Sequence, residues 1–145
     1  MEPEHTTGYY RDAFGYAGTR VRAWILNHER RDDGSWFSRW DGRFTSDPST
    51  LDIDHTVALK EAWDSGAWAW SENKRRTFAN DEVNPFTLNA ITSSLNRSKS
   101  DQDGAWAAPA NRCQYVQQVA WIKTFYGLSV DPDEKRVMLD VARRC

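Results

Sequence analysis

Histidine and cysteine, the residues that most often bind zinc, are scarce in this sequence. The 145 residues include three histidines and two cysteines, at positions 5, 28, 55, 113 and 145. A structural zinc site needs four such ligands close together, and zinc motifs usually supply them at short, regular spacings. The wide separation of these residues argues against a zinc site.

Long apolar runs are also missing. No segment approaches the roughly 18 consecutive apolar residues of a membrane-spanning helix. The opening residues, MEPEHTTGYY, are polar and acidic and lack the pattern of a secretion signal. With 39% apolar and 28% charged residues, the chain has the composition of a globular protein. We expect one domain over residues 1–145, monomeric and without a membrane partner.

Positive charge is not in excess. The formal net charge is −2, so the total charge does not by itself indicate nucleic-acid binding. Basic residues gather locally in the segments 20–22, 74–76 and 96–99. Each segment could belong to a positive groove or to a solvated surface of mixed charge, and both interpretations stay open. Tryptophan is abundant, with eight residues, most of which we expect in the core.

The stretch LDIDHTVAL, which begins at Leu51, places two acids and a histidine in an apolar run. Leu51 and Ile53 alternate with acidic residues, which predicts a strand with one buried face. Asp52, Asp54 and His55 are therefore expected close together at the end of this strand.

Three interpretations of this cluster are open. The acids could be surface residues of an edge strand, with His55 packed as an ordinary side chain. A zinc site is disfavoured by the lack of further ligands. A carboxylate and an amide oxygen could instead bind a hard cation such as Mg²⁺, which keeps several waters and meets a phosphate. A neutral histidine beside that cation could take a proton from an attacking water.

The remaining periodicity predicts a mixture of helices and strands. Helical spacing appears at residues 19–30, 57–67, 71–81 and 92–103, a hairpin or packed loop is expected at 32–44, and a second short strand at 84–91. The middle of the chain is therefore predicted to run strand, helical insertion, strand, helix.

Two further helices are predicted at the C-terminal end. The first ends at Gly127, a typical C-cap. The second begins with DPDE, in which Asp131 is the N-cap and Glu134 closes a capping box. The short connection makes the helices antiparallel, so that Cys113 and Cys145 come within bridging reach. We expect a disulfide and an oxidising compartment, with two separate buried thiols as the alternative.

Taken in order, the segments DIDHTVAL, FAND and NRSKSDQD resemble the HNH endonuclease superfamily. The longer pattern LDIDHTVALKEAWDSGAWAW…FANDEVN…NRSKSDQD…W is similar to the DUF1524 branch of actinobacterial proteins, related to the C-terminal domain of GmrSD modification-dependent restriction enzymes. The resemblance covers residues 50–145 well and 8–45 loosely. It implies an α+β fold, with a ββα-metal core at residues 50–103, a helical insertion, and flanking N- and C-terminal helices, the latter a pair at 111–145.

The resemblance also implies catalytic roles. His55 is similar to the general base that activates water in these enzymes. Asp54 and Asn96 are similar to the protein ligands of a single divalent cation, which we expect to be Mg²⁺, with Mn²⁺ or another divalent cation as alternatives.

A further asparagine orients the histidine ring in such modules. We assign this role to Asn84, which follows FAND, although Asn89 is also near the expected spacing. We expect Asp52 to support the site by contacting the cation's ligands without binding the cation itself.

Several basic residues are candidates for contacts with the nucleic-acid backbone, which add salt-dependent and sequence-independent affinity. They are Arg97 and Lys99 beside Asn96, Lys74, Arg75 and Arg76 on the inserted helix, and Arg20 near the N-terminal end.

The sequence thus predicts a metal-dependent endonuclease that cleaves DNA to leave 5′-phosphate and 3′-hydroxyl ends. A ribonuclease with the same site is one alternative, because phosphate chemistry does not read the sugar. A non-catalytic, tryptophan-rich module that binds nucleic acid or sugar by stacking is another. The disulfide favours a secreted protein over a cytoplasmic one, and nothing in the residues speaks for or against an inhibitor protein.

Overall fold

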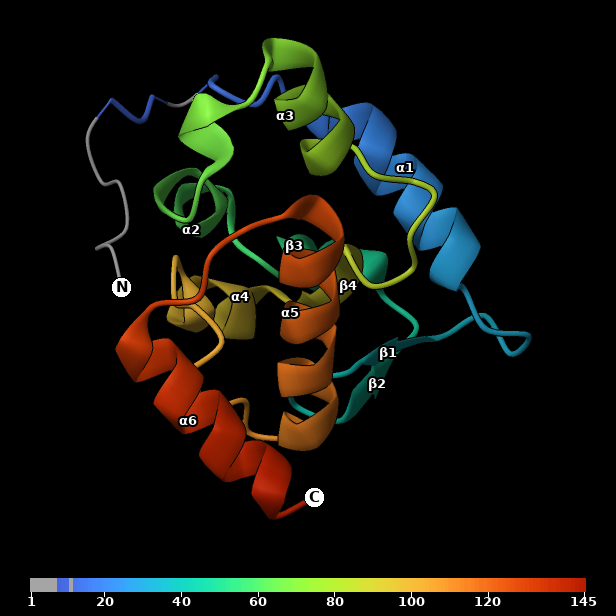
Figure 1. Ribbon diagram of the computed structural model, residues 1–145. Coiled ribbons are helices and arrows are strands. Elements are labelled where there is room, and N and C mark those ends of the chain that lie inside the picture. Colours follow the sequence, from blue (N-terminus) through green and yellow to red (C-terminus); the bar gives the residue numbers. More distant parts are fainter. Residues whose placement is uncertain (1–7, 11) are drawn as a thin grey trace.

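The computed structural model describes residues 8–10 and 12–145 and has a mixed α+β fold (Figure 1). This agrees with the fold class predicted from the sequence. The elements, in chain order, are α1 (Gly18–Glu29), β1 (Trp36–Ser38), β2 (Arg43–Thr45), β3 (Leu51–His55), α2 (Leu59–Asp64), α3 (Glu72–Ala79), β4 (Leu88–Thr92), α4 (Ser93–Lys99), α5 (Arg112–Tyr126) and α6 (Pro132–Arg143). Short 3-10 turns, η1 (Pro48–Thr50) and η2 (Ala67–Ala69), precede β3 and follow α2.

The antiparallel pair β3–β4 is the centre of the fold. Leu51 lies opposite Thr92 and His55 opposite Leu88 in the register of the two strands. Because side chains alternate across a strand, the two faces of the pair face different cores. Leu51 and Leu88 pack with α1, whereas Ile91 belongs to the larger core under the C-terminal helices.

The segment between β3 and β4 is the helical insertion that the sequence predicts, containing α2 and α3. The second strand begins at Leu88, however, and not at residue 84 as expected. The reason is a turn organised by Asp81, whose carboxylate accepts hydrogen bonds from the backbone of Val83, from Asn84 and from the Thr87 hydroxyl. These local bonds take the place of strand pairing until the turn ends.

Helix α4 follows β4 without a loop and contacts both β3 and β4. Strand, strand and helix are thus adjacent in space although the insertion separates the strands in sequence. Asp52 and Asp54 on β3 lie on the side of the pair where α4 begins, since Ser93 at the first position of α4 donates to Asp52. This adjacency brings the side chains of α4 to the end of β3.

Helices α5 and α6 form the antiparallel pair predicted at the C-terminal end (Figure 1). Gly127 ends α5 with a left-handed φ of 74°, and the Asp131 side chain caps α6. Glu134 does not close the predicted capping box. Its carboxylate turns inward instead, where it accepts hydrogen bonds from the Gly104 amide and from the Lys123 ammonium. The ion pair with Lys123 compensates the cost of burying the carboxylate.

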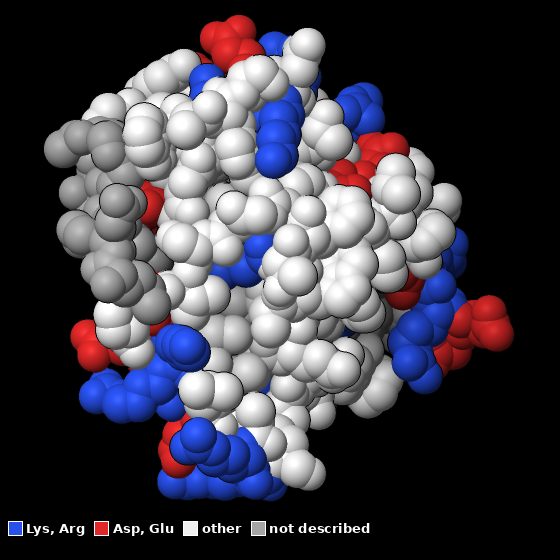
Figure 2. Space-filling model, viewed as in Figure 1, with Lys and Arg blue, Asp and Glu red and all other residues white. Residues whose placement is uncertain are grey.

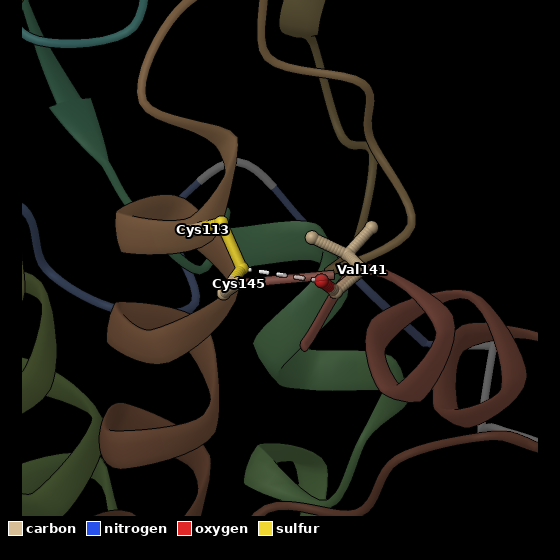
Figure 3. Close-up of a disulfide and its surroundings, with 3 residues drawn as sticks. All are labelled: Cys113, Val141 and Cys145. Carbon is tan, nitrogen blue, oxygen red and sulfur yellow. Dashed lines mark hydrogen bonds between the residues drawn. A yellow bond between two sulfur atoms is a disulfide. The ribbon is translucent and has the colours of Figure 1, made fainter. Parts of the chain in front are cut away.

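The predicted disulfide between Cys113 and Cys145 is present, with the two Cα atoms 6.0 Å apart. Figure 3 shows that it joins the start of α5 to Cys145, two residues beyond the end of α6, with Sγ of Cys145 lying 3.1 Å from the carbonyl oxygen of Val141. The bridge closes the helical pair at its open end and confirms the geometric prediction.

Among the described residues, none of the helices is both long enough and apolar enough to span a bilayer. In the view of Figure 2, which shows the face carrying α5, Lys, Arg, Asp and Glu side chains lie mainly toward the edges and the centre is largely uncharged. This face is therefore poorly suited to binding a phosphate backbone.

Candidate functional site

A surface cavity of about 270 Å³ lies at the end of β3, between the start of α2 and the end of α4. Its lining combines polar and apolar side chains, namely Tyr9, Ile53, Asp54, His55, Ala58, Leu59, Lys60, Asn96, Ser100 and Asp101. Three residues predicted from the sequence, Asp54, His55 and Asn96, thus meet in one cavity. They meet because β3 ends there and α4 runs alongside it.

The His55 ring is held in one orientation. Its Nε2 lies 2.8 Å from the backbone carbonyl oxygen of Ala79, at the end of α3. The Tyr16 ring packs edge-on against it, with the ring centroids 4.7 Å apart. A carbonyl oxygen can only accept a hydrogen bond, so Nε2 carries the proton of the neutral ring and Nδ1 is left unprotonated.

Electrostatics keep this ring neutral. Burial lowers the pKa of His55 to about 4, although the Ala79 carbonyl and the nearby Asp54 carboxylate both act to raise it. The Lys99 ammonium also acts to lower it. At neutral pH the imidazole is therefore uncharged, which is the form that can accept a proton at Nδ1.

Asp54 is buried and strongly anchored. Only 2% of the residue is exposed, and Lys99 Nζ donates to Oδ1 at 2.8 Å while Trp40 Nε1 donates to Oδ2 at 3.3 Å. Lys99 is itself fully buried and also donates to the carbonyl oxygens of His55 and Thr56. These bonds compensate the buried carboxylate and fix the backbone around His55.

Asn96 faces the cavity from α4. Its Nδ2 lies 3.5 Å from Oδ2 of Asp52, and the other oxygen of Asp52 accepts from the Ser93 hydroxyl at 2.9 Å. This long contact turns the amide nitrogen of Asn96 toward Asp52. Among the described residues the amide oxygen then has no hydrogen-bond partner, so it is free to act as a ligand.

These side chains could hold a hard cation. Asp54 and Asn96 supply a carboxylate and an amide oxygen in the same cavity, and Asp101 adds a further carboxylate to its lining. Such a set suits Mg²⁺, which takes few protein ligands and keeps waters in its remaining positions. The Lys99–Asp54 bond lowers the negative charge available there, which favours a weakly held cation.

A second group of carboxylates lies around a buried lysine. Glu61, Asp103 and Glu134 have ligand atoms within 4.8 Å of one another, as found among the residues the structure describes. The buried Lys123 ammonium forms ion pairs with Glu61 and, at 2.9 Å, with Glu134. Lys123 thus neutralises part of the charge of this cluster and links α2, α5 and α6.

Among the described residues, neither asparagine proposed to orient His55 forms a hydrogen bond with its ring. Asn84 donates to Asp81 at 2.8 Å, within the turn before β4, and does not line the His55 cavity. Asn89 is fully buried opposite Asp54 in the β3–β4 register and donates to the Thr56 hydroxyl, with its amide oxygen unpaired. The Ala79 carbonyl holds the ring in their place.

The six basic candidates divide by exposure. Lys99 and Arg75 are buried, and Arg75 donates to backbone carbonyls of Ala13, Ala67 and Trp70. Both are therefore parts of the interior and do not present their charge to an external phosphate. The exposed candidates are Arg97, Arg76, Lys74, whose ammonium lies 4.3 Å from the centre of the Trp70 ring, and Arg20, which pairs with Glu82 at 2.7 Å.

Several residues of the cavity were missed by sequence reasoning. Lys60 and Asp101 line it, and the chain gives a signal only for Asp101, which follows the NRSKS segment directly. Tyr16 and the Ala79 carbonyl act by position alone. A backbone carbonyl carries no residue-type signal, so the sequence could not have identified it.

Comparisons with known proteins identify the family to which the chain belongs. Residues 7–141 match the family model described as GmrSD restriction endonucleases, C-terminal domain. A protein of Arthroderma benhamiae, named an uncharacterized secreted protein, is 40% identical over 156 residues, which cover 95% of this chain and 76% of that protein. No solved structure matches the chain significantly. Because the family model covers nearly the whole sequence, this chain belongs to the family of the C-terminal domain of GmrSD restriction endonucleases, a nuclease-related family.

Proposed function

We propose that the protein is a metal-dependent HNH endonuclease that hydrolyses DNA phosphodiester bonds. The observation that carries this proposal is the geometry of His55. Its Nε2 is bonded to the Ala79 carbonyl, which leaves Nδ1 unprotonated, and His55, Asp54 and Asn96 line one cavity. The family membership supports a nuclease-type reaction.

In this proposal His55 acts as the general base. Nδ1 accepts a proton from a water that attacks the phosphorus, and the Ala79 carbonyl stabilises the imidazolium that forms by accepting from Nε2. The P–O3′ bond breaks as the new P–O bond forms, which leaves 5′-phosphate and 3′-hydroxyl ends. The Tyr16 ring packs edge-on against the imidazole and restricts its rotation.

Asp54 and Asn96 hold the divalent cation, which we propose to be Mg²⁺ or Mn²⁺. When bound, such a cation withdraws charge from the scissile phosphate and stabilises the leaving oxygen. Asp52 positions the Asn96 amide so that its oxygen points away from the Asp52 carboxylate. The order β3, β4, α4 supports assignment of these elements to a ββα-metal core.

The substrate contacts are proposed from exposed positive charge. Arg97 lies one residue beyond Asn96 on α4, and Lys60 lines the cavity itself. We propose that Arg97, and Lys60 on release from its ion pair with Asp64, contact phosphates that flank the scissile one. We propose DNA as the substrate and, as the second candidate, RNA, because none of the cavity groups distinguishes the two sugars.

We also propose that the protein is secreted. The disulfide is stable only in an oxidising compartment, and the Arthroderma benhamiae relative is named a secreted protein. The monomeric state remains our expectation from the sequence.

The test of the proposed function is a cleavage assay on supercoiled plasmid and on structured RNA, each with EDTA, Mg²⁺ or Mn²⁺. We expect nicking and then linearisation of the plasmid with either cation and none with EDTA. Cleavage of RNA alone would replace DNA by RNA as the substrate. If a folded, disulfide-bonded protein cleaves neither substrate with any cation, the enzyme proposal fails and a binding module remains.

A further inference from the structure

Tyr9 lines the His55 cavity but has no role in the reaction proposed for it. It shares the lining with Asp54, His55 and Asn96. It precedes α1, far in sequence from β3 and α4, and its side chain is half-buried. The N-terminal part of the chain thus contributes an aromatic hydroxyl-bearing residue to the site.

The Tyr9 ring is held from two sides by residues of α2. It packs edge-on against Trp63, with the ring centroids 5.9 Å apart. The Lys60 ammonium lies 5.7 Å from the centre of the Tyr9 ring, within the range of cation–π attraction. Gly8 directly before it has a left-handed φ of 82°, a conformation that glycine adopts without strain. These contacts fix Tyr9 at the wall of the cavity formed by α2.

The hydroxyl of Tyr9 lies near the acidic side of the cavity. Burial raises the pKa of Tyr9, and the carboxylates of Asp101 and Asp64 raise it further. Charges act on a partly exposed group over about 10 Å in physiological salt, so the hydroxyl is close to both acids. Asp101 is itself part of the cavity lining. The phenol keeps its proton at neutral pH and can donate a hydrogen bond there.

Most other hydrogen-bond donors of the cavity are already engaged. Lys60 donates to the two oxygens of Asp64 at 2.7 and 2.8 Å. The Nε2 proton of His55 is bonded to a backbone carbonyl, and the amide nitrogen of Asn96 lies 3.5 Å from Asp52. None of these groups is left to meet the oxygens of a phosphate at His55 without first giving up a partner.

Two hydroxyl groups in the lining remain available. Those of Tyr9 and Ser100 form no hydrogen bond with another residue in the part of the chain that the structure describes. Ser100 is exposed at the end of α4, where its hydroxyl can rotate in water. The Tyr9 hydroxyl is carried by a ring that Trp63 and Lys60 hold in place. Tyr9 is therefore the available donor with a fixed position.

We propose that Tyr9 is a further catalytic residue, whose hydroxyl donates a hydrogen bond to a non-bridging oxygen of the scissile phosphate. This inference rests on the proposed function, because it needs a phosphate beside His55. The hydroxyl keeps its proton throughout, and the hydrogen bond strengthens as the attacking oxygen adds to phosphorus and charge grows on the non-bridging oxygens. A donor is needed at this wall, since the nearby Asp101 and Asp64 repel an anion.

The test is single-turnover cleavage, with Mg²⁺, of whichever substrate the wild type cuts, plasmid or RNA. Tyr9→Phe removes the hydroxyl and keeps the ring on Trp63. We expect the cleavage rate at saturating protein to fall by about 10²-fold. The Mg²⁺ requirement and the affinity for a labelled oligonucleotide, measured by fluorescence anisotropy in EDTA, should stay unchanged, because the hydrogen bond strengthens only in the transition state.

Tyr10→Phe is the matched control. Tyr10 packs on the same Trp63 ring, with the centroids 6.2 Å apart, but it is 52% exposed and is not part of the cavity lining. This variant should cleave like the wild type. Ser100→Ala removes the other available hydroxyl and should cost much less than Tyr9→Phe. Thermal unfolding checks that all three variants are folded.

A folded Tyr9→Phe variant that cleaves as fast as Tyr10→Phe would overturn the inference and leave the nuclease intact. A loss found only in Ser100→Ala would overturn it as well and assign the donor to Ser100. A loss in Tyr9→Phe that added Mg²⁺ restores would show that Tyr9 acts on the cation and not on the phosphate. If the wild type leaves plasmid and RNA uncut, the proposed function fails and this inference fails with it.

Discussion

Replacing Lys99 by methionine tests how the candidate site is held together. Lys99 is fully buried, and its ammonium donates at 2.8 Å to Asp54, at 2.9 Å to the His55 carbonyl and at 3.1 Å to the Thr56 carbonyl. Methionine keeps the length and the apolar part of the side chain but removes all three bonds. Of the hydrogen bonds found among the described residues, Asp54 would then keep the one from Trp40.

Removing one partner of a buried ion pair costs about 3–5 kcal/mol, because the remaining charge is left uncompensated. For a domain of this size the unfolding midpoint should then fall by about 10 °C. Adding Asp54→Asn removes the stranded charge, so the double variant should be less destabilised than the two single variants added together.

The assay is urea or thermal unfolding under non-reducing conditions, followed by circular dichroism. Lys60→Met is the matched control, because Lys60 forms a partly exposed ion pair with Asp64 at 2.7 Å and should cost no more than about 1 kcal/mol. A Lys99→Met variant no less stable than Lys60→Met, or single variants whose effects simply add, would refute this account of Asp54.

Three further predictions concern the rest of the molecule. Lys123→Met should destabilise the protein most at neutral pH. Burial already raises the pKa of Glu134 and loss of Lys123 raises it further, so the folded variant keeps a proton that the unfolded chain releases above about pH 4.3. The loss of unfolding free energy relative to the wild type should therefore shrink on acidification, and an equal loss at about pH 4 and pH 7 in urea unfolding would contradict this. Cys113→Ser opens a loop with a sequence separation of 32 residues and should cost about 3–4 kcal/mol by the same method, whereas an unchanged unfolding midpoint would show that the bridge does not constrain the unfolded chain. Asp52→Ala should raise the Mg²⁺ concentration for half-maximal cleavage by about 10–100-fold by releasing Asn96, and an unchanged Mg²⁺ requirement in a folded variant would count against that role.

Local signals made much of the fold predictable. Asp131 and Gly127 mark helix ends through side-chain capping and a left-handed backbone, so the C-terminal helices and the disulfide between them followed from a short stretch of sequence. The alternation around Asp52 and Asp54 likewise placed β3 at its observed position.

Long-range partners were not predictable in the same way. Lys99 lies in a basic segment whose composition is typical of a solvent-exposed surface. Its burial depends on the ion pair with Asp54, 45 residues away in sequence. Asn84 has the residue type expected of an orienting group, but Asp81, three residues before it, captures its side chain. The histidine is held instead by the carbonyl of Ala79, whose position only the folded chain determines.

The central claim, that His55 is the general base of a nuclease, is tested most directly by one comparison. Supercoiled plasmid is incubated with Mg²⁺ and wild-type protein, His55→Ala, or the control Gln114→Ala, which truncates an exposed side chain on α5. We predict that His55→Ala remains folded and loses about 10²–10⁴-fold in cleavage rate, while Gln114→Ala cleaves like the wild type. A folded His55→Ala variant that cleaves at the wild-type rate would contradict the account.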